Sequence, residues 1–164
     1  METQFVEIPQ PHELTTREKE DAMGAYLMMF AALAIGLPFP ILNLVAALIY
    51  YYVNRSKGRF VHFHLLQSLY SQIPTTLLNV VLVSWTVRIL FFNVEISDLY
   101  WGYLAMDIVA NLIYFVFSII AAVKSRKGQL YYFAFFGKIA YTTVFAVSNK
   151  MYSEKEIINK PPTI

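Results

Sequence analysis

Three long apolar blocks interrupt this chain, at about residues 22–53, 63–92 and 101–123. The hydrocarbon core of a bilayer is about 30 Å thick, so a crossing helix needs about 20 mostly apolar residues. Each block reaches that length, and 57% of the 164 residues are apolar, more than a soluble domain usually contains. These blocks predict an all-α, polytopic integral membrane protein with one membrane helical domain at 22–127.

The first block is too long for one straight crossing and contains a proline turn. A helix over 22–53 would be about 48 Å long, against a core of about 30 Å. Pro38 and Pro40 remove backbone donors and break helical geometry, so we expect two short helices joined at these prolines. The later blocks predict a long helix bent at Pro74 and one clean span. The expected fold is a small bundle of about four membrane helices.

A polar tail at 1–21 precedes the first block, and basic residues predict its side of the membrane. Thr15 followed by Glu18 has capping-box spacing, which predicts that a helix begins there. Of the 13 basic residues, 12 lie in this tail, in "NRSKGR", in "KSRKG" or beyond, whereas the 93–99 loop has two acids and no Lys or Arg. Because cytoplasmic loops carry the excess of Lys and Arg, we expect a plasma (inner) membrane protein with both termini cytoplasmic and 93–99 outside.

The last apolar stretch, "QLYYFAFFGKIAYTTVFAVSNK", allows two interpretations. It is about long enough to span, but Lys138 lies in its middle and a crossing at 130–147 would carry three later lysines outside. We therefore expect 128–164 to form an aromatic helix at the inner interface followed by a polar C-terminal tail. A spanning helix is the alternative.

Polar side chains form a stripe on each of the two later helices. At 100° per residue, five residues of the second block fall on one face of a helix, and a sixth flanks them. Because polar groups cannot face lipid cheaply, both stripes should face protein or water. They form either interhelical hydrogen bonds or a polar groove, for which the candidate residues are His64, Gln67, Ser68, Ser71, Thr75, Asn79, Asp107, Asn111, Tyr114 and Ser118.

Asp107 is an acid inside the third block. An intramembrane carboxylate is costly and is by default a candidate functional residue. Arg88 lies at matching depth on the preceding helix, so an ion pair between Arg88 and Asp107 is one possibility. Alternatively, Arg88 reaches the outer headgroups.

The sequence has no pattern of enzyme chemistry. It contains no cysteine, and His62 and His64 would point about 200° apart on a helix, so they cannot share a metal ion. It also lacks HExxH, CxxC, GxSxG and Gly-rich phosphate motifs. We therefore expect no catalytic residue, metal site or cofactor. The net charge of +2 does not indicate nucleic acid, and the expected partners are the lipid bilayer and another membrane protein.

The stretch "GRFVHFHLLQSL" resembles a signature of the Tic-twenty-like family, which comprises a chloroplast inner-envelope import component and bacterial relatives. The likeness is carried by Phe60, Val61, Phe63, His64 and Gln67. "GLPFPILNLVAALIYYYVNR" is similar to the proline-broken first hairpin of that family, and "AAVKSRKGQLYYF" to the segment that closes its bacterial members. The likeness spans about residues 22–135, and the long aromatic C-terminal extension departs from it.

This resemblance implies a small multi-spanning helical protein, tied in plastids to protein translocation. Two function classes follow. One is a non-enzymatic accessory or channel-like subunit that moves or inserts polypeptides through the polar groove. The other is a structural or regulatory subunit that binds another membrane complex. An intramembrane enzyme or carrier that uses Asp107 and His64 has the least support.

Overall fold

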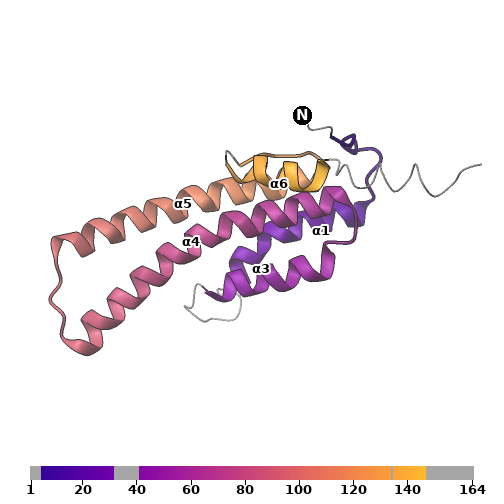
Figure 1. Cartoon of the computed structure of the whole chain (residues 1–164). Helices are drawn as coiled ribbons and strands as arrows, with labels where there is room; N and C mark the ends of the chain where they lie inside the picture. The colour runs from indigo at the N-terminus through magenta and orange to yellow at the C-terminus, as the bar shows by residue number, and fades with distance from the viewer. Residues whose placement is uncertain (1–4, 32–40, 134, 147–164) are drawn as a thin grey trace, which may run out of the picture.

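The computed structural model describes residues 5–31, 41–133 and 135–146. Within them the regular structure is helical, apart from an isolated bridge between Phe5 and Ala146. The all-α expectation is therefore confirmed for the described residues. In chain order the elements are α1 (Thr16–Leu27), the 3-10 turn η1 (Met28–Phe30), α3 (Ile41–Asn54), α4 (Arg59–Phe92), α5 (Asp98–Arg126) and α6 (Phe136–Phe145) (Figure 1).

The helix α1 begins at the capping box that the sequence predicts. The Thr15 hydroxyl accepts from the Glu18 backbone N–H at 3.2 Å, and the Glu18 carboxylate accepts from the Thr15 backbone N–H at 2.9 Å. This reciprocal pair satisfies donors that a helix N-terminus leaves free. The proline break at Pro38 and Pro40 lies outside the described residues.

The expected number of about four membrane helices is too high for the described residues. There, α4 and α5 are the two helices long and apolar enough to cross a membrane. α1 has 12 residues and α3 has 14, both short of the ~20 that a crossing needs. The capping box also starts α1 within the polar segment, so much of that helix is charged. Within the described residues, the part suited to span a membrane is thus the hairpin of α4 and α5.

The helix α4 has a protein-covered half and an exposed half. It runs 34 residues and continues through Pro74, although Pro74 cannot donate a backbone hydrogen bond. Phe60 and Phe63 near its start are at most 1% exposed, whereas Leu90 and Phe91 near its end are 68% and 75% exposed. Because large apolar side chains cannot line a water-exposed surface over such a length, the second half is suited to face lipid.

The shorter helices cover one end of the hairpin (Figure 1). α1, α3 and α6 pack on α4, and α1 also packs on α5. Beyond them, α4 and α5 continue as an antiparallel pair. Hydrogen bonds between α4 and α5 join this part: the Tyr103 hydroxyl donates to the Leu78 carbonyl at 3.0 Å, and the hydroxyls of Thr86 and Tyr100 are 3.0 Å apart.

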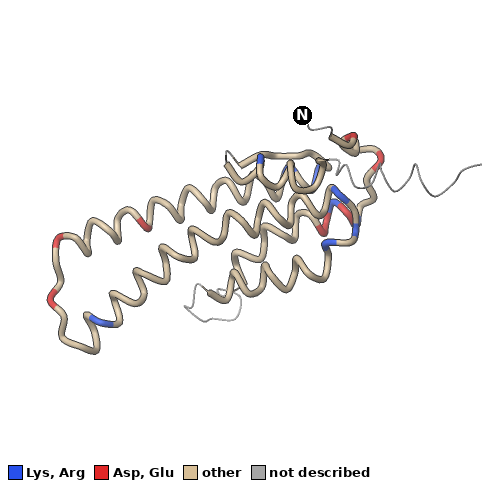
Figure 2. Tube along the Cα trace, viewed as in Figure 1, with Lys and Arg blue, Asp and Glu red and all other residues tan. Residues whose placement is uncertain are grey.

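Charged residues gather at the two ends of the molecule (Figure 2). At the end where α1 begins, Lys57 pairs with Asp21 at 2.9 Å and Arg126 pairs with Glu20 at 2.7 Å. Both acids belong to α1, so these pairs connect α1 to the turn just before α4 and to the end of α5. The long middle of the hairpin is almost free of charge, as a membrane span requires.

The chain after α5 turns back along the bundle before α6 begins. Gly128, with φ of 74°, follows the last turn of α5, and a side chain there would meet Pro11 and Lys19. Residues 129–133 are not helical, and α6 has 10 residues, about 15 Å of helix. The described part of 130–147 is therefore not one continuous helix, because residues 130–133 are not helical and α6 alone is shorter than a crossing needs.

Candidate functional site

Gln67 of α4 joins three parts of the fold at a fully buried position. Its amide nitrogen donates to the Tyr26 hydroxyl of α1 and to the Tyr131 carbonyl, both at 2.8 Å. Its amide oxygen accepts from the Phe133 backbone N–H at 3.1 Å. Both amide protons are used, and the chain after α5 is held against α4 through its backbone. Gly137 permits this approach, because a Cβ there would lie 2.7 Å from the Gln67 oxygen.

His64 lies one helical turn before Gln67 and is also fully buried. Its Nδ1 is 2.8 Å from the Tyr26 hydroxyl, and the rings of Phe60 and Phe63 approach it at 4.6 and 5.0 Å between centroids. Since Gln67 already donates to the Tyr26 oxygen, the hydroxyl can direct its own proton to Nδ1. Burial raises the pKa of Tyr26, so this phenol stays protonated and remains a donor.

Small residues bring α1 close to both α3 and α4. The Ser68 hydroxyl of α4 donates to the Ala25 carbonyl at 2.7 Å. Tyr50 of α3 crosses α1 at Gly24 and donates to the Asp21 carbonyl at 3.2 Å. A Cβ at Gly24 would overlap the Tyr50 ring, so the absence of a side chain there is a condition of this packing.

A pair of amides joins the two spanning helices. Asn79 Nδ2 donates to Asn111 Oδ1 at 3.1 Å, and Asn111 Nδ2 donates to Asn79 Oδ1 at 3.3 Å. Each amide also bonds within its own helix, to the Thr75 carbonyl at 2.7 Å and the Asp107 carbonyl at 2.8 Å. Such interhelical bonds hold helices together where the hydrophobic effect cannot, and this reciprocal pair sets the register of α4 against α5.

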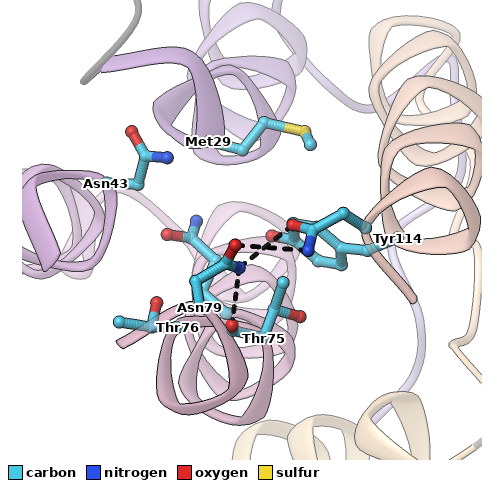
Figure 3. Close-up of a pocket in the computed structure, with 8 residues that line it drawn as sticks. Met29, Asn43, Thr75, Thr76, Asn79 and Tyr114 are labelled. Atoms are coloured by element: carbon cyan, nitrogen blue, oxygen red, sulfur yellow. Dashed lines mark hydrogen bonds between the residues drawn. The ribbon is translucent and has the colours of Figure 1, made fainter. Parts of the chain in front are cut away.

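A small polar cavity lies beside the amide pair (Figure 3). Its volume of about 70 Å³ has room for a few water molecules, since one needs about 10–15 Å³ by this measure. Side chains converge on it from η1, α3, α4 and α5 (Figure 3). The lining residues are Met29, Asn43, Gln72, Thr75, Thr76, Asn79, Asn111 and Tyr114.

The wall of this cavity is suited to hold water. The Gln72 amide oxygen and the Tyr114 hydroxyl are buried there without a hydrogen-bond partner among the described residues. Buried polar groups of this kind are commonly satisfied by internal water. Tyr114 is the one titratable side chain in the lining. In the part of the chain that the structure describes, no three His, Asp or Glu residues are grouped to hold a metal ion.

Asp107 contacts the amide pair and does not contact Arg88. One carboxylate oxygen accepts from Asn111 at 3.1 Å, and the other is buried without a partner. The ion pairs found among the described residues are those of Lys57 with Asp21 and Arg126 with Glu20, so an Arg88–Asp107 pair is absent. The reason is rotational: Arg88 lies about 180° from Asn79 around α4, and it is Asn79 that faces α5.

The candidate groove residues divide into two groups. Those near the start of α4 make contacts with α1, with the chain after α5 or within α4 itself: His64, Gln67, Ser68 and Ser71. Those farther along surround the polar cavity or the amide pair: Thr75, Asn79, Asp107, Asn111 and Tyr114. Ser118 is 1% exposed and its hydroxyl has no partner within the described chain. Ser71 of the first group lines the same hollow as Thr75 and Tyr114 of the second.

Two side chains outside the predicted stripes also belong to this polar interior. Gln72 lies one turn after Ser68 and donates to its hydroxyl at 3.2 Å, so helical spacing could have identified it. Tyr26 lies on α1, and residues 131 and 133 contribute backbone groups. No periodicity in α4 or α5 points to them.

Comparison with protein families matches residues 19–140 to MamF/MmsF, the magnetosome magnetite crystal formation protein family. Comparisons with curated proteins and with solved structures find no match. The resemblance to the Tic-twenty-like family was therefore wrong, and the translocation role that it implied is not supported. In the structure, the residues of the short motif pack α4 against its neighbours: Phe60 and Val61 contact α1, and Phe63 contacts α6. This chain is a small membrane protein of the magnetosome magnetite crystal formation family.

Proposed function

We propose that this chain is a non-enzymatic component of the magnetosome membrane that takes part in the formation of magnetite crystals. The family match over residues 19–140 is the observation that carries this proposal. The two apolar helices α4 and α5 supply the membrane anchor.

A structural mode of action is supported by how the polar interior is used. Asn79 and Asn111 bond to each other, and Gln67 bonds to two neighbouring segments. These side chains are therefore committed to holding helices in place. The apolar faces of α4 and α5 beyond the shorter helices remain available to lipid and to another membrane protein, which is the partner that we propose.

The proposed topology places both termini on the cytoplasmic side. Its support is the skew of basic residues toward one end of the hairpin, where Lys124 and Arg126 close α5, together with the positive-inside rule. The turn between α4 and α5, with Glu95 and Asp98, then lies on the opposite side of the membrane.

Deletion and complementation in a magnetosome-forming host test the proposal. Deletion should change the size or shape of the crystals seen by electron microscopy, and the wild-type gene should restore them. Asp107→Asn and Tyr114→Phe remove ionisable groups with little change of shape, so both should complement fully if no reaction is catalysed. Immunoblots of purified magnetosomes control for protein level.

Two results would count against the proposal. Normal crystals after deletion would show that the protein has no role in crystal formation. Failure of Asp107→Asn or Tyr114→Phe to complement at a normal protein level would indicate that the chemistry of that group is required.

A further inference from the structure

A second and larger hollow lies between the two spanning helices and α6. Its volume is about 440 Å³. It is lined by Ser71, Pro74, Thr75, Ala110, Ile113, Tyr114, Phe117, Tyr132, Phe133, Phe135 and Phe136. Apolar and aromatic side chains dominate this lining, so the hollow differs in character from the polar cavity.

The walls of the hollow continue the lipid-facing surface of the hairpin. Ile113 is 53% exposed and Phe117 is 44% exposed. Both lie on α5, which is long and apolar enough to cross a membrane. At that depth the molecules in contact with an apolar surface are acyl chains. An acyl chain can therefore enter the hollow from the bilayer without crossing a polar region.

A lysine lies directly in line with this hollow on the same face of α5. At 100° per residue, Lys124 lies within about 20° of Ile113 and Phe117 around the helix. It follows Phe117 by two turns, which is about 10 Å along the axis. Lys124 is exposed and has no ion pair among the described residues. Arg126, by contrast, lies on another face and pairs with Glu20.

A neighbouring apolar hollow adds room for a second chain. It is about 390 Å³ in volume and lies between α4 and α6. It shares Pro74 and Phe136 with the first hollow, and its other lining residues are Tyr70, Ile73, Leu77 and Ile139. The two hollows therefore adjoin at Pro74, with the basic end of α5 on the side toward the headgroups.

From this alignment we infer that the protein binds an anionic phospholipid, with one acyl chain against Ile113 and Phe117 and the phosphate at Lys124. The lysine ammonium attracts an anionic headgroup at the membrane surface, and the aromatic wall made by Tyr132, Phe133, Phe135 and Phe136 confines the chain below it. The site is built by α4, α5 and α6 together, which distinguishes it from the ordinary lipid contacts of a single exposed helix.

Photolabelling of the full-length protein in phosphatidylcholine vesicles tests this site. The probes are phosphatidylglycerol and phosphatidylcholine that carry the same diazirine on an acyl chain, and mass spectrometry locates the label. Phosphatidylglycerol should label Ala110, Ile113, Phe117 or Phe136 several-fold more than Leu112, which is exposed on another face of α5. Phosphatidylcholine should show no such preference.

Matched variants separate the headgroup contact from the chain contact. Lys124→Gln should lower the labelling of the hollow by phosphatidylglycerol to the level seen with phosphatidylcholine. Lys138→Gln, on a face of α6 away from Phe136, should leave it unchanged. Ala110→Trp should block the hollow, whereas Ala105→Trp on another face of α5 should not. Circular dichroism melting verifies that each variant folds. If Ala110→Trp fails to fold, Lys124→Gln still tests the site, because it removes no buried contact.

Uniform labelling over the exposed faces of α4 and α5 would overturn the inference, because it would show that only annular lipid contacts the protein. The inference would also be overturned if phosphatidylglycerol labelled the hollow equally in the wild type and in Lys124→Gln. Crosslinks between two copies of the chain through the hollow, in place of lipid labelling, would identify a protein occupant and would likewise refute lipid binding there.

Discussion

At the scale of single residues, Gln67 makes three hydrogen bonds at a position closed to water. Gln67→Met keeps the approximate volume but leaves the Tyr131 carbonyl and the Phe133 N–H unsatisfied. Each buried unsatisfied group costs about 1–3 kcal/mol, so a loss of that order for each is expected in the free energy of unfolding. Gln72→Met, which removes one hydrogen bond to Ser68, is the matched control and should cost less. Equal losses in steric-trapping measurements would contradict this role of Gln67.

Gly24 and Gly102 form a second matched comparison at this scale. A methyl group at Gly24 would overlap the Tyr50 ring, whereas nothing lies within 4 Å of one at Gly102. Gly24→Ala should destabilise by about 1–3 kcal/mol, as overpacking does, and adding Tyr50→Ala should recover part of that loss. Gly102→Ala should be neutral or stabilising by up to about 1 kcal/mol, because alanine favours helix. A harmless Gly24→Ala would refute the close crossing of α1 by Tyr50.

At the scale of elements, the amide pair connects α4 to α5. A double-mutant cycle with Asn79→Ala and Asn111→Ala should give a coupling energy of about 0.6–1.7 kcal/mol, which lies between the average and the largest value measured for interhelical bonds in membranes. A cycle with Arg88→Gln and Asp107→Asn should be additive within about 0.3–0.5 kcal/mol, because these residues make no contact. The reverse pattern would mean that α4 is rotated about its axis relative to the structure.

The sequence predicted some elements well, for reasons that are local. Thr15 and Glu18 carry the capping box within four residues, and α5 lies in an unbroken apolar block. The number of spans could not be predicted in this way, because α1 and α3 are short and find their partners only through the fold. The same holds for the polar stripe on α4. Asn79 meets α5 while Gln67 meets α1 and residues 131–133, and spacing along one helix cannot reveal which neighbour covers each turn.

At the scale of the whole molecule, three short helices enclose one end of a two-helix hairpin (Figure 1). Ion pairs at that end join α1 to the turn just before α4 and to the end of α5. The helices nearest the two termini therefore lie at the same end as most of the basic residues. The acidic turn lies about 40 Å away along α5, at 1.5 Å per residue. In the proposed topology, this hairpin crosses the magnetosome membrane and has both ends on one side.

Cysteine labelling of purified, intact magnetosomes tests that central claim most directly, because the chain has no cysteine of its own. Single cysteines at Ser56, Ile96 and Lys127, all exposed or in turns, would be treated with an impermeant maleimide before and after detergent. The proposed topology predicts labelling at positions 56 and 127 on intact vesicles and at position 96 only after detergent. Labelling at position 96 on intact vesicles, or protection of 56 and 127, would contradict it.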